Sequence, residues 1–131
     1  MPLIHASIVP HAGPALPELA PDGRMGVATR AAMAAIEGLV AFGQALRRAA
    51  DASPRRVALV ASVDQGHAHA SDGPYGYNPA SAIFDTLIQE IVATSRLERL
   101  LELDEEFVEA AMPDSVESLL VLYGAVREPG F

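Results

Sequence analysis

The chain has 131 residues, with 17 acidic side chains against 9 basic ones, which gives a formal net charge of −8 at pH 7. This length fits one domain over residues 1–131, whose core needs no disulfide or metal to hold it together. Because cysteine is absent, disulfides, thiolate metal sites and cysteine nucleophiles are excluded. The acidic balance and the scattered arginines argue against nucleic-acid binding, which needs a clustered basic face.

The sequence also bears on where the protein works. A membrane-spanning helix needs about 18 or more consecutive apolar residues, and no such run is present. The first residues, MPLIHA, lack the basic start of a secretory signal. We therefore expect a cytoplasmic protein that does not act in a membrane.

The first half of the chain predicts a strand, a long helix and a second strand. Residues 3–9 are rich in apolar and β-branched types and end at a proline. Apolar residues recur at intervals of three and four over residues 27–50, which predicts an amphipathic helix. Residues 56–63, RVALVASV, are typical of a strand buried on both faces. This order predicts an α/β fold class, a small βαβ-type parallel sheet flanked by helices.

The second half of the chain predicts further helices after a loop. Residues 71–79, SDGPYGYNP, contain too much glycine and proline for regular structure. Helical spacing then resumes in residues 80–95, 104–112 and 114–126, and residues 97–103 are predicted to be a short helical piece or a turn. We see no internal repeat, so one domain remains the expectation.

The four histidines, His5, His11, His67 and His69, all lie in or directly after the two predicted strands. The carboxyl ends of parallel strands meet at the edge of the sheet where α/β proteins bind ligands, so His11 and residues 64–69, DQGHAH, should be neighbours. Neutral imidazole binds Fe(II), Zn(II) or Mn(II) and exchanges protons near neutral pH. Alternatively, His11 is a surface loop residue, and His5, inside a strand, is a structural histidine.

His67 and His69 are two residues apart, so they share a face of an extended segment and diverge in a turn. One of them can serve as a metal ligand and the other as a base. Alternatively, Asp64 caps a turn, and His69 is a hydrogen-bonded group behind the site. The sequence leaves both interpretations open.

A carboxylate would complete the arrangement of two histidines and one carboxylate that holds Fe(II) in many oxygenases. Asp114 and Glu117 are candidates, although their spacing is also that of a capped helix N-terminus. Tyr75 and Tyr77 could stack on or hydrogen-bond to a small aromatic ligand, or else pin their loop. The phosphate-binding and nucleophile-elbow motifs are absent from the sequence.

Together these stretches resemble a known family, the class III extradiol ring-cleavage dioxygenases. The resemblance is to the catalytic B subunit of the protocatechuate 4,5-dioxygenase and 2-aminophenol 1,6-dioxygenase type. It rests on five stretches, IVPHAGP at 8–14, VASVDQGHAH at 60–69, DGPYGYNP at 72–79, FD at 84–85 and LYGA at 122–125. Of these, DGPYGY is specific, whereas a lone Pro-His pair would be weak.

The resemblance implies a non-haem Fe(II) enzyme that binds a catechol-type or aminophenol-type substrate, activates O2 on the same metal and opens the aromatic ring. His11 matches the first iron ligand of the family. His67 matches the acid/base histidine near substrate and oxygen, with Asp64 and His69 as its neighbours in catalysis. The carboxylate ligand aligns with Asp114, and Glu117 lies close to it in sequence.

Family members are longer, and their second histidine ligand comes from a middle strand with no counterpart between His11 and His67. We therefore expect a shortened version of the fold, in which His69, His5 or a residue of another subunit supplies this ligand. Because two strands make a marginal sheet, we also expect a homo-oligomer. The alternative function is that of a non-catalytic, metal-free relative that binds a small ligand or a partner subunit.

Overall fold

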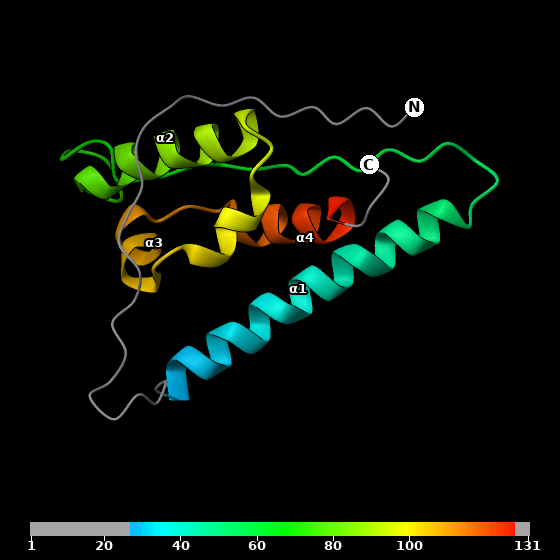
Figure 1. Ribbon diagram of the computed structural model, residues 1–131. Coiled ribbons are helices and arrows are strands. Elements are labelled where there is room, and N and C mark those ends of the chain that lie inside the picture. The colour runs from blue at the N-terminus through cyan, green and yellow to red at the C-terminus, as the bar shows by residue number, and fades with distance from the viewer. Residues whose placement is uncertain (1–26, 128–131) are drawn as a thin grey trace.

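The computed structural model describes residues 27–127, and the side chains from residue 32 onward. His5, His11 and the predicted strand over residues 3–9 lie outside the described residues. The helical elements follow in the order α1 (Val27–Asp51), α2 (Pro79–Ala93), η1 (Leu97–Glu102), α3 (Glu105–Ala111) and α4 (Val116–Val126). All of them coincide with the helical segments that the sequence predicts, so this part of the prediction is confirmed (Figure 1).

The second predicted strand, residues 56–63, is extended and runs back along α4 and α2 (Figure 1). Leu59, Ala61 and Val63 pack against the hydrophobic core, whereas Val60 between them is 68% exposed. This alternation is that of a strand with one face buried. Within residues 27–127 the segment has no ladder partner, so the parallel sheet stays a prediction.

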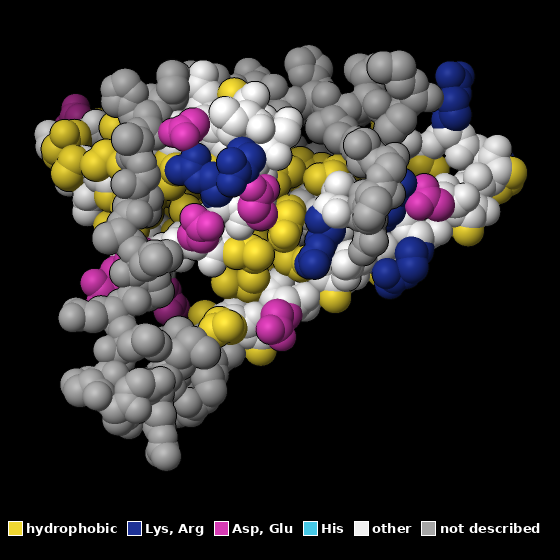
Figure 2. Space-filling model, viewed as in Figure 1, with side chains coloured by type: hydrophobic (Ala, Val, Ile, Leu, Met, Phe, Trp, Pro, Cys, Tyr) yellow, Lys and Arg dark blue, Asp and Glu magenta, His cyan; other side chains and the backbone are white. Residues whose placement is uncertain are grey.

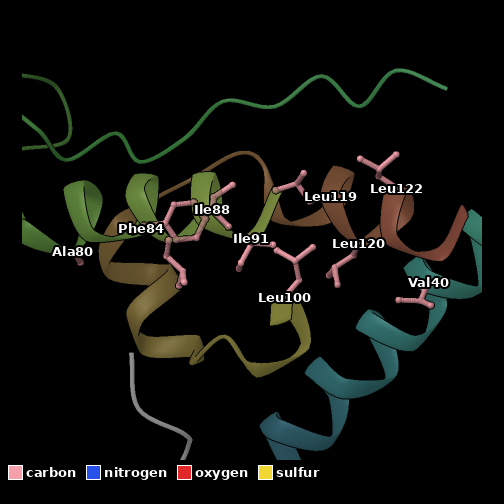
Figure 3. Close-up of a cluster of buried hydrophobic side chains, with 11 residues drawn as sticks. Val40, Ala80, Phe84, Ile88, Ile91, Leu100, Leu119, Leu120 and Leu122 are labelled. Carbon is pink, nitrogen blue, oxygen red and sulfur yellow. The ribbon is translucent and has the colours of Figure 1, made fainter. Parts of the chain in front are cut away.

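The core lies between α2, η1 and α4, with α1 at its edge (Figure 3). Phe84, Ile88 and Ile91 of α2 are wholly buried, at the helical spacing of three and four that puts them on one face. Leu100 of η1 is also buried and belongs to the same cluster. Phe107 of α3 packs against the Phe84 ring, with centroids 6.0 Å apart. Every helical element therefore contributes to one core.

Side-chain caps fix where α2 and α3 begin. The Asn78 Oδ1 accepts a hydrogen bond from the Ala80 N–H at 3.0 Å, and Pro79 occupies the first turn of α2. The Asp104 Oδ1 accepts from the Phe107 N–H at 2.9 Å at the start of α3. Both caps satisfy backbone donors that would otherwise lack a partner. The loops before these helices therefore end at defined points.

Helices α1 and α4 cross in direct backbone contact. A Cβ at Gly43 of α1 would lie 2.0 Å from the Val121 carbonyl oxygen, and one at Gly124 of α4 would lie 2.1 Å from the Val40 carbonyl oxygen. Both distances are far below van der Waals contact, so only glycine fits either position at this crossing. The long helix α1 is thereby held against the core.

Charged side chains on the surface are interspersed rather than segregated. Arg47 Nε donates to the Asp51 carboxylate at 2.8 Å, and Arg99 Nη1 donates to the Glu90 carboxylate at 2.7 Å. On the face shown in Figure 2, acidic side chains likewise lie beside basic ones. Among the described helices, none is long and apolar enough to cross a membrane.

Replacing Gly43 with alanine should lower the free energy of unfolding by about 1–3 kcal/mol, because the added methyl must push α1 and α4 apart. The matched control is Gly38→Ala in the same helix, where a Cβ meets nothing within 4 Å. This control should raise the free energy of unfolding by roughly 0.5–1 kcal/mol through helix propensity. Urea unfolding of both variants measures the difference, and equal effects would contradict the close crossing.

We propose that residues 56–63 form the α/β sheet by pairing with a strand of a second copy of the chain. The support is the buried and exposed alternation together with the marginal stability of isolated strands. Sedimentation velocity should show a homo-oligomer that Val60→Pro weakens, because proline removes a backbone donor. Val60→Thr keeps that donor and should associate like the parent chain. A parent chain that stays monomeric at all concentrations would refute the proposal.

Candidate active site

The candidate site forms where the loop of residues 64–69 meets the chain that leaves α3. The His67 N–H donates to the Ala111 carbonyl at 3.1 Å, and the Asp114 N–H donates to the Asp64 carbonyl, also at 3.1 Å. These two backbone hydrogen bonds join segments that are far apart in the sequence. They bring the DQGHAH motif next to the start of α4.

The His67 ring lies between two hydrogen-bond acceptors. Its Nδ1 is 2.6 Å from the Met112 carbonyl oxygen, and its Nε2 is 3.2 Å from the Asp64 Oδ2. A neutral imidazole has one N–H, so only the imidazolium can donate to both partners. The hydrogen bond to the Met112 carbonyl is the largest cause of a raised pKa of His67. Burial opposes it, and the hydrogen bond to Asp64 and the charges of Asp64 and Asp114 raise the pKa further.

Met112, whose carbonyl contacts His67 Nδ1, has an unusual backbone conformation. It follows the last residue of α3 with φ 52° and ψ 50°, the left-handed conformation that commonly ends helices. Methionine is rare in this region, where glycine is the usual residue. The conformation is observed together with the short hydrogen bond from His67 to the Met112 carbonyl.

A cavity of about 330 Å³ opens beside this histidine. Its wall is formed by His67, Tyr75, Val108, Glu109, Met112, Pro113 and Asp114. The Tyr75 ring lies 5.1 Å from the His67 ring, tilted by 50°. The structure therefore brings together three predicted site residues, His67, Tyr75 and Asp114, with the Asp64 carboxylate in contact with His67.

His69 is directed to a different partner, although it is only two residues from His67. Its Nε2 lies 2.9 Å from the Asp85 Oδ2, and its backbone forms an antiparallel bridge with Tyr77. Neither His69 nor Tyr77 lines the cavity. The turn between the two histidines, with the His69 N–H donating to the His67 carbonyl at 3.0 Å, explains this divergence.

The two candidate carboxylates, Asp114 and Glu117, lie in different surroundings. Asp114 lines the cavity, whereas Glu117 is an exposed residue in the first turn of α4. Ser115 is the N-cap of α4, and its side chain makes no capping hydrogen bond. Instead, the Ser115 hydroxyl donates to the Gln65 Oε1 at 3.1 Å, which ties the start of α4 to the loop of His67. Of these two carboxylates, Asp114 is therefore the one at the cavity.

The described residues do not by themselves fit a metal centre. Between residues 27 and 127, no three His, Asp or Glu side chains converge closely enough to hold a metal ion. In addition, both ring nitrogens of His67 face acceptors, whereas a ligand nitrogen must present its lone pair. His11, the first predicted ligand, lies outside the described residues.

A second cavity, of about 370 Å³, lies between the end of α1, residues 57–59 and α4. Its lining is mostly apolar and includes neither histidine nor a carboxylate. This cavity has no group that could exchange protons at neutral pH. The candidate chemistry therefore belongs to the cavity of His67.

Three residues that hold the site were not predicted from the sequence. They are Asp85, which contacts His69, Met112, whose carbonyl contacts the His67 ring, and Ser81, whose hydroxyl donates to the Ala111 carbonyl at 2.9 Å. The pattern FD at residues 84–85 was part of the resemblance, but it assigned no role to the carboxylate. For Ser81 and Met112 the residue type gave no signal, because each acts through a contact with a distant part of the chain.

The chain is similar in sequence to known proteins. The family described as the catalytic LigB subunit of aromatic ring-opening dioxygenase matches residues 21–130. This chain belongs to that family. The match includes every described residue of the candidate site, and the resemblance inferred from the sequence motifs is confirmed.

A relative in Clostridium acetobutylicum, named Protein CA_C1420, is 32% identical over 103 residues. The aligned region is 79% of this chain and 22% of that protein. The chain thus corresponds to less than a quarter of the relative, whose name states no activity.

We predict that NMR titration will give His67 a pKa above its ordinary value of 6.5, because the imidazolium satisfies both acceptors. Since the folded state binds this proton more tightly, the stabilisation is complete below the unfolded pKa and is lost as pH rises through the folded pKa. Asp64→Asn should lower the His67 pKa, whereas Glu106→Gln on α3 should leave it unchanged. An unshifted parent value would refute the two-acceptor geometry.

Proposed function

We propose that this chain acts in Fe(II)-dependent extradiol ring cleavage of a small aromatic, of the catechol or aminophenol type, with O2 as the second substrate. The observation that carries the proposal is the position of His67, which two acceptors hold at the wall of a cavity shared with Tyr75 and Asp114. Membership of a family of aromatic ring-opening dioxygenases supports the reaction class.

His67 is the proposed acid/base group, and its hydrogen bonds assign a role to each ring nitrogen. A carbonyl can only accept, so the Met112 oxygen keeps the proton on Nδ1 in both charge states of the ring. Nε2 is therefore the nitrogen that gains and loses a proton. Asp64, whose side chain is 78% exposed, can release Nε2 when a substrate hydroxyl approaches.

The cavity suits a ligand with a single aromatic ring. Its volume of about 330 Å³ lies at the small end of the range for small-molecule sites, roughly 300–1,000 Å³. Val108 and Met112 supply apolar wall, and the Tyr75 ring offers a surface on which an aromatic ligand can stack. These features support Tyr75, rather than Tyr77, as the substrate-binding tyrosine.

Iron is the cofactor that the family resemblance implies, with His11 and Asp114 as proposed ligands and Glu117 as a neighbouring carboxylate. Of the two that the structure describes, Asp114 lines the cavity and Glu117 does not. Because residues 27–127 do not complete a metal centre, the remaining donors must come from outside that range or from a second copy of the chain. In this proposal His67 carries the proton transfer.

The second candidate function is a metal-free relative that binds a small ligand or a partner subunit without catalysis. The observation that favours it is the absence of three converging ligand side chains among residues 27–127. The cavity beside His67 would then be a binding site alone. Metal analysis separates the two candidates.

Anaerobic reconstitution with Fe(II), followed by metal analysis and oxygen-uptake assays over a panel of catechols and aminophenols, tests the first candidate. We expect bound iron and oxygen uptake with at least one of these compounds. His67→Phe should reduce turnover by about 10²–10⁴-fold, the usual contribution of a positioned acid/base group, with iron content unchanged. Glu106→Gln on the exposed side of α3 is the control and should retain full turnover.

Two outcomes of this assay would contradict the proposal. Absence of both iron and oxygen uptake in the parent chain would favour the metal-free relative. Loss of iron from His67→Phe would instead identify His67 as a ligand, so its assignment as the acid/base group would be wrong.

A further inference from the structure

The first turns of α2 present polar side chains to the loop that carries His67. Ser81 and Asp85 are four residues apart, so they lie on the same face of the helix. Both make hydrogen bonds to backbone groups of that loop. The acid/base, substrate-binding and metal-binding roles proposed above use neither residue.

The Ser81 hydroxyl joins the two segments that hold His67. Its Oγ accepts from the Ala68 N–H at 2.9 Å and donates to the Ala111 carbonyl at 2.9 Å. Ala68 follows His67 in the loop, and Ala111 precedes Met112 at the end of α3. Ser81 itself is fully buried. One hydroxyl therefore connects the backbone beside His67 to the backbone beside the carbonyl that its ring contacts.

Asp85 and Gly66 fix the other side of the same loop. The Asp85 Oδ1 accepts from the Gly66 N–H at 2.7 Å, while its Oδ2 contacts His69. A Cβ at Gly66 would lie 2.8 Å from both the Cα and the Cβ of Ser81, so the loop lies directly on α2. The backbone on both sides of His67 is thus attached to one helix face.

We propose that Ser81 is a positioning residue for His67, whose hydroxyl sets the separation between the loop and the end of α3 and so keeps Nδ1 on the Met112 carbonyl. The consequence for catalysis rests on the proposed function of His67. The positioning itself is a property of the folded chain and can be measured without any substrate.

The test compares Ser81→Ala with Thr86→Val in ¹⁵N-histidine-labelled protein. Thr86 is the matched control, because it is a buried hydroxyl on the same helix whose Oγ1 donates to the Ala82 carbonyl within α2. The readout is the proton NMR signal of the His67 Nδ1–H, assigned by its absence from His67→Phe. We expect this signal in the parent chain and in Thr86→Val, and its loss through solvent exchange in Ser81→Ala.

Ser81→Cys provides a second variant should Ser81→Ala fail to fold, since a thiol fills the site of the hydroxyl but is only a weak donor and acceptor. It should broaden the same signal. Retention of a sharp His67 Nδ1–H signal in the folded variants would overturn the proposal, as would equal loss in Thr86→Val.

Turnover measured on the same variants separates this proposal from the proposed function. If Ser81→Ala loses the signal and His67→Phe loses turnover, Ser81→Ala should also lose turnover, while Thr86→Val keeps it. If His67→Phe stays fully active, the proposed function fails, but loss of the signal in Ser81→Ala still supports the positioning role.

Discussion

The hydrogen bond from His67 Nδ1 to the Met112 carbonyl, 2.6 Å long, is the interaction on which the candidate site depends. It fixes the ring orientation, assigns Nε2 as the exchangeable nitrogen and favours the imidazolium together with Asp64. It also requires that the loop of residues 64–69 and the end of α3 keep a fixed separation. The fold is arranged so that both are attached to α2.

The loop is attached to α2 through its backbone N–H groups. A serine and an aspartate, which are common residues, are therefore enough to hold it. The Ser81 hydroxyl and the Asp85 carboxylate bind loop N–H groups, and Gly66 permits the close approach. Behind them, the apolar face of α2 anchors the helix in the core. The same helix therefore presents a core face and a face that holds the loop of the site.

Much of the fold could be predicted from local pattern, because helical periodicity and breakers are local signals. The helix over 27–50 and the break at Pro113 needed no tertiary information. The left-handed conformation of Met112 and the divergence of His67 from His69 could not be predicted in this way. Both depend on contacts with segments distant in sequence, such as the bonds to Ala111 and Asp85.

The central claim is that a small aromatic binds in the cavity beside His67. Titration of ¹⁵N-labelled protein with catechol, followed by NMR, tests it most directly. If catechol binds there, saturable shifts should appear at His67, Tyr75 and Asp114, with none at Leu46 and Ala125 of the second cavity. Shifts confined to that second cavity, or none at His67, would contradict binding beside His67.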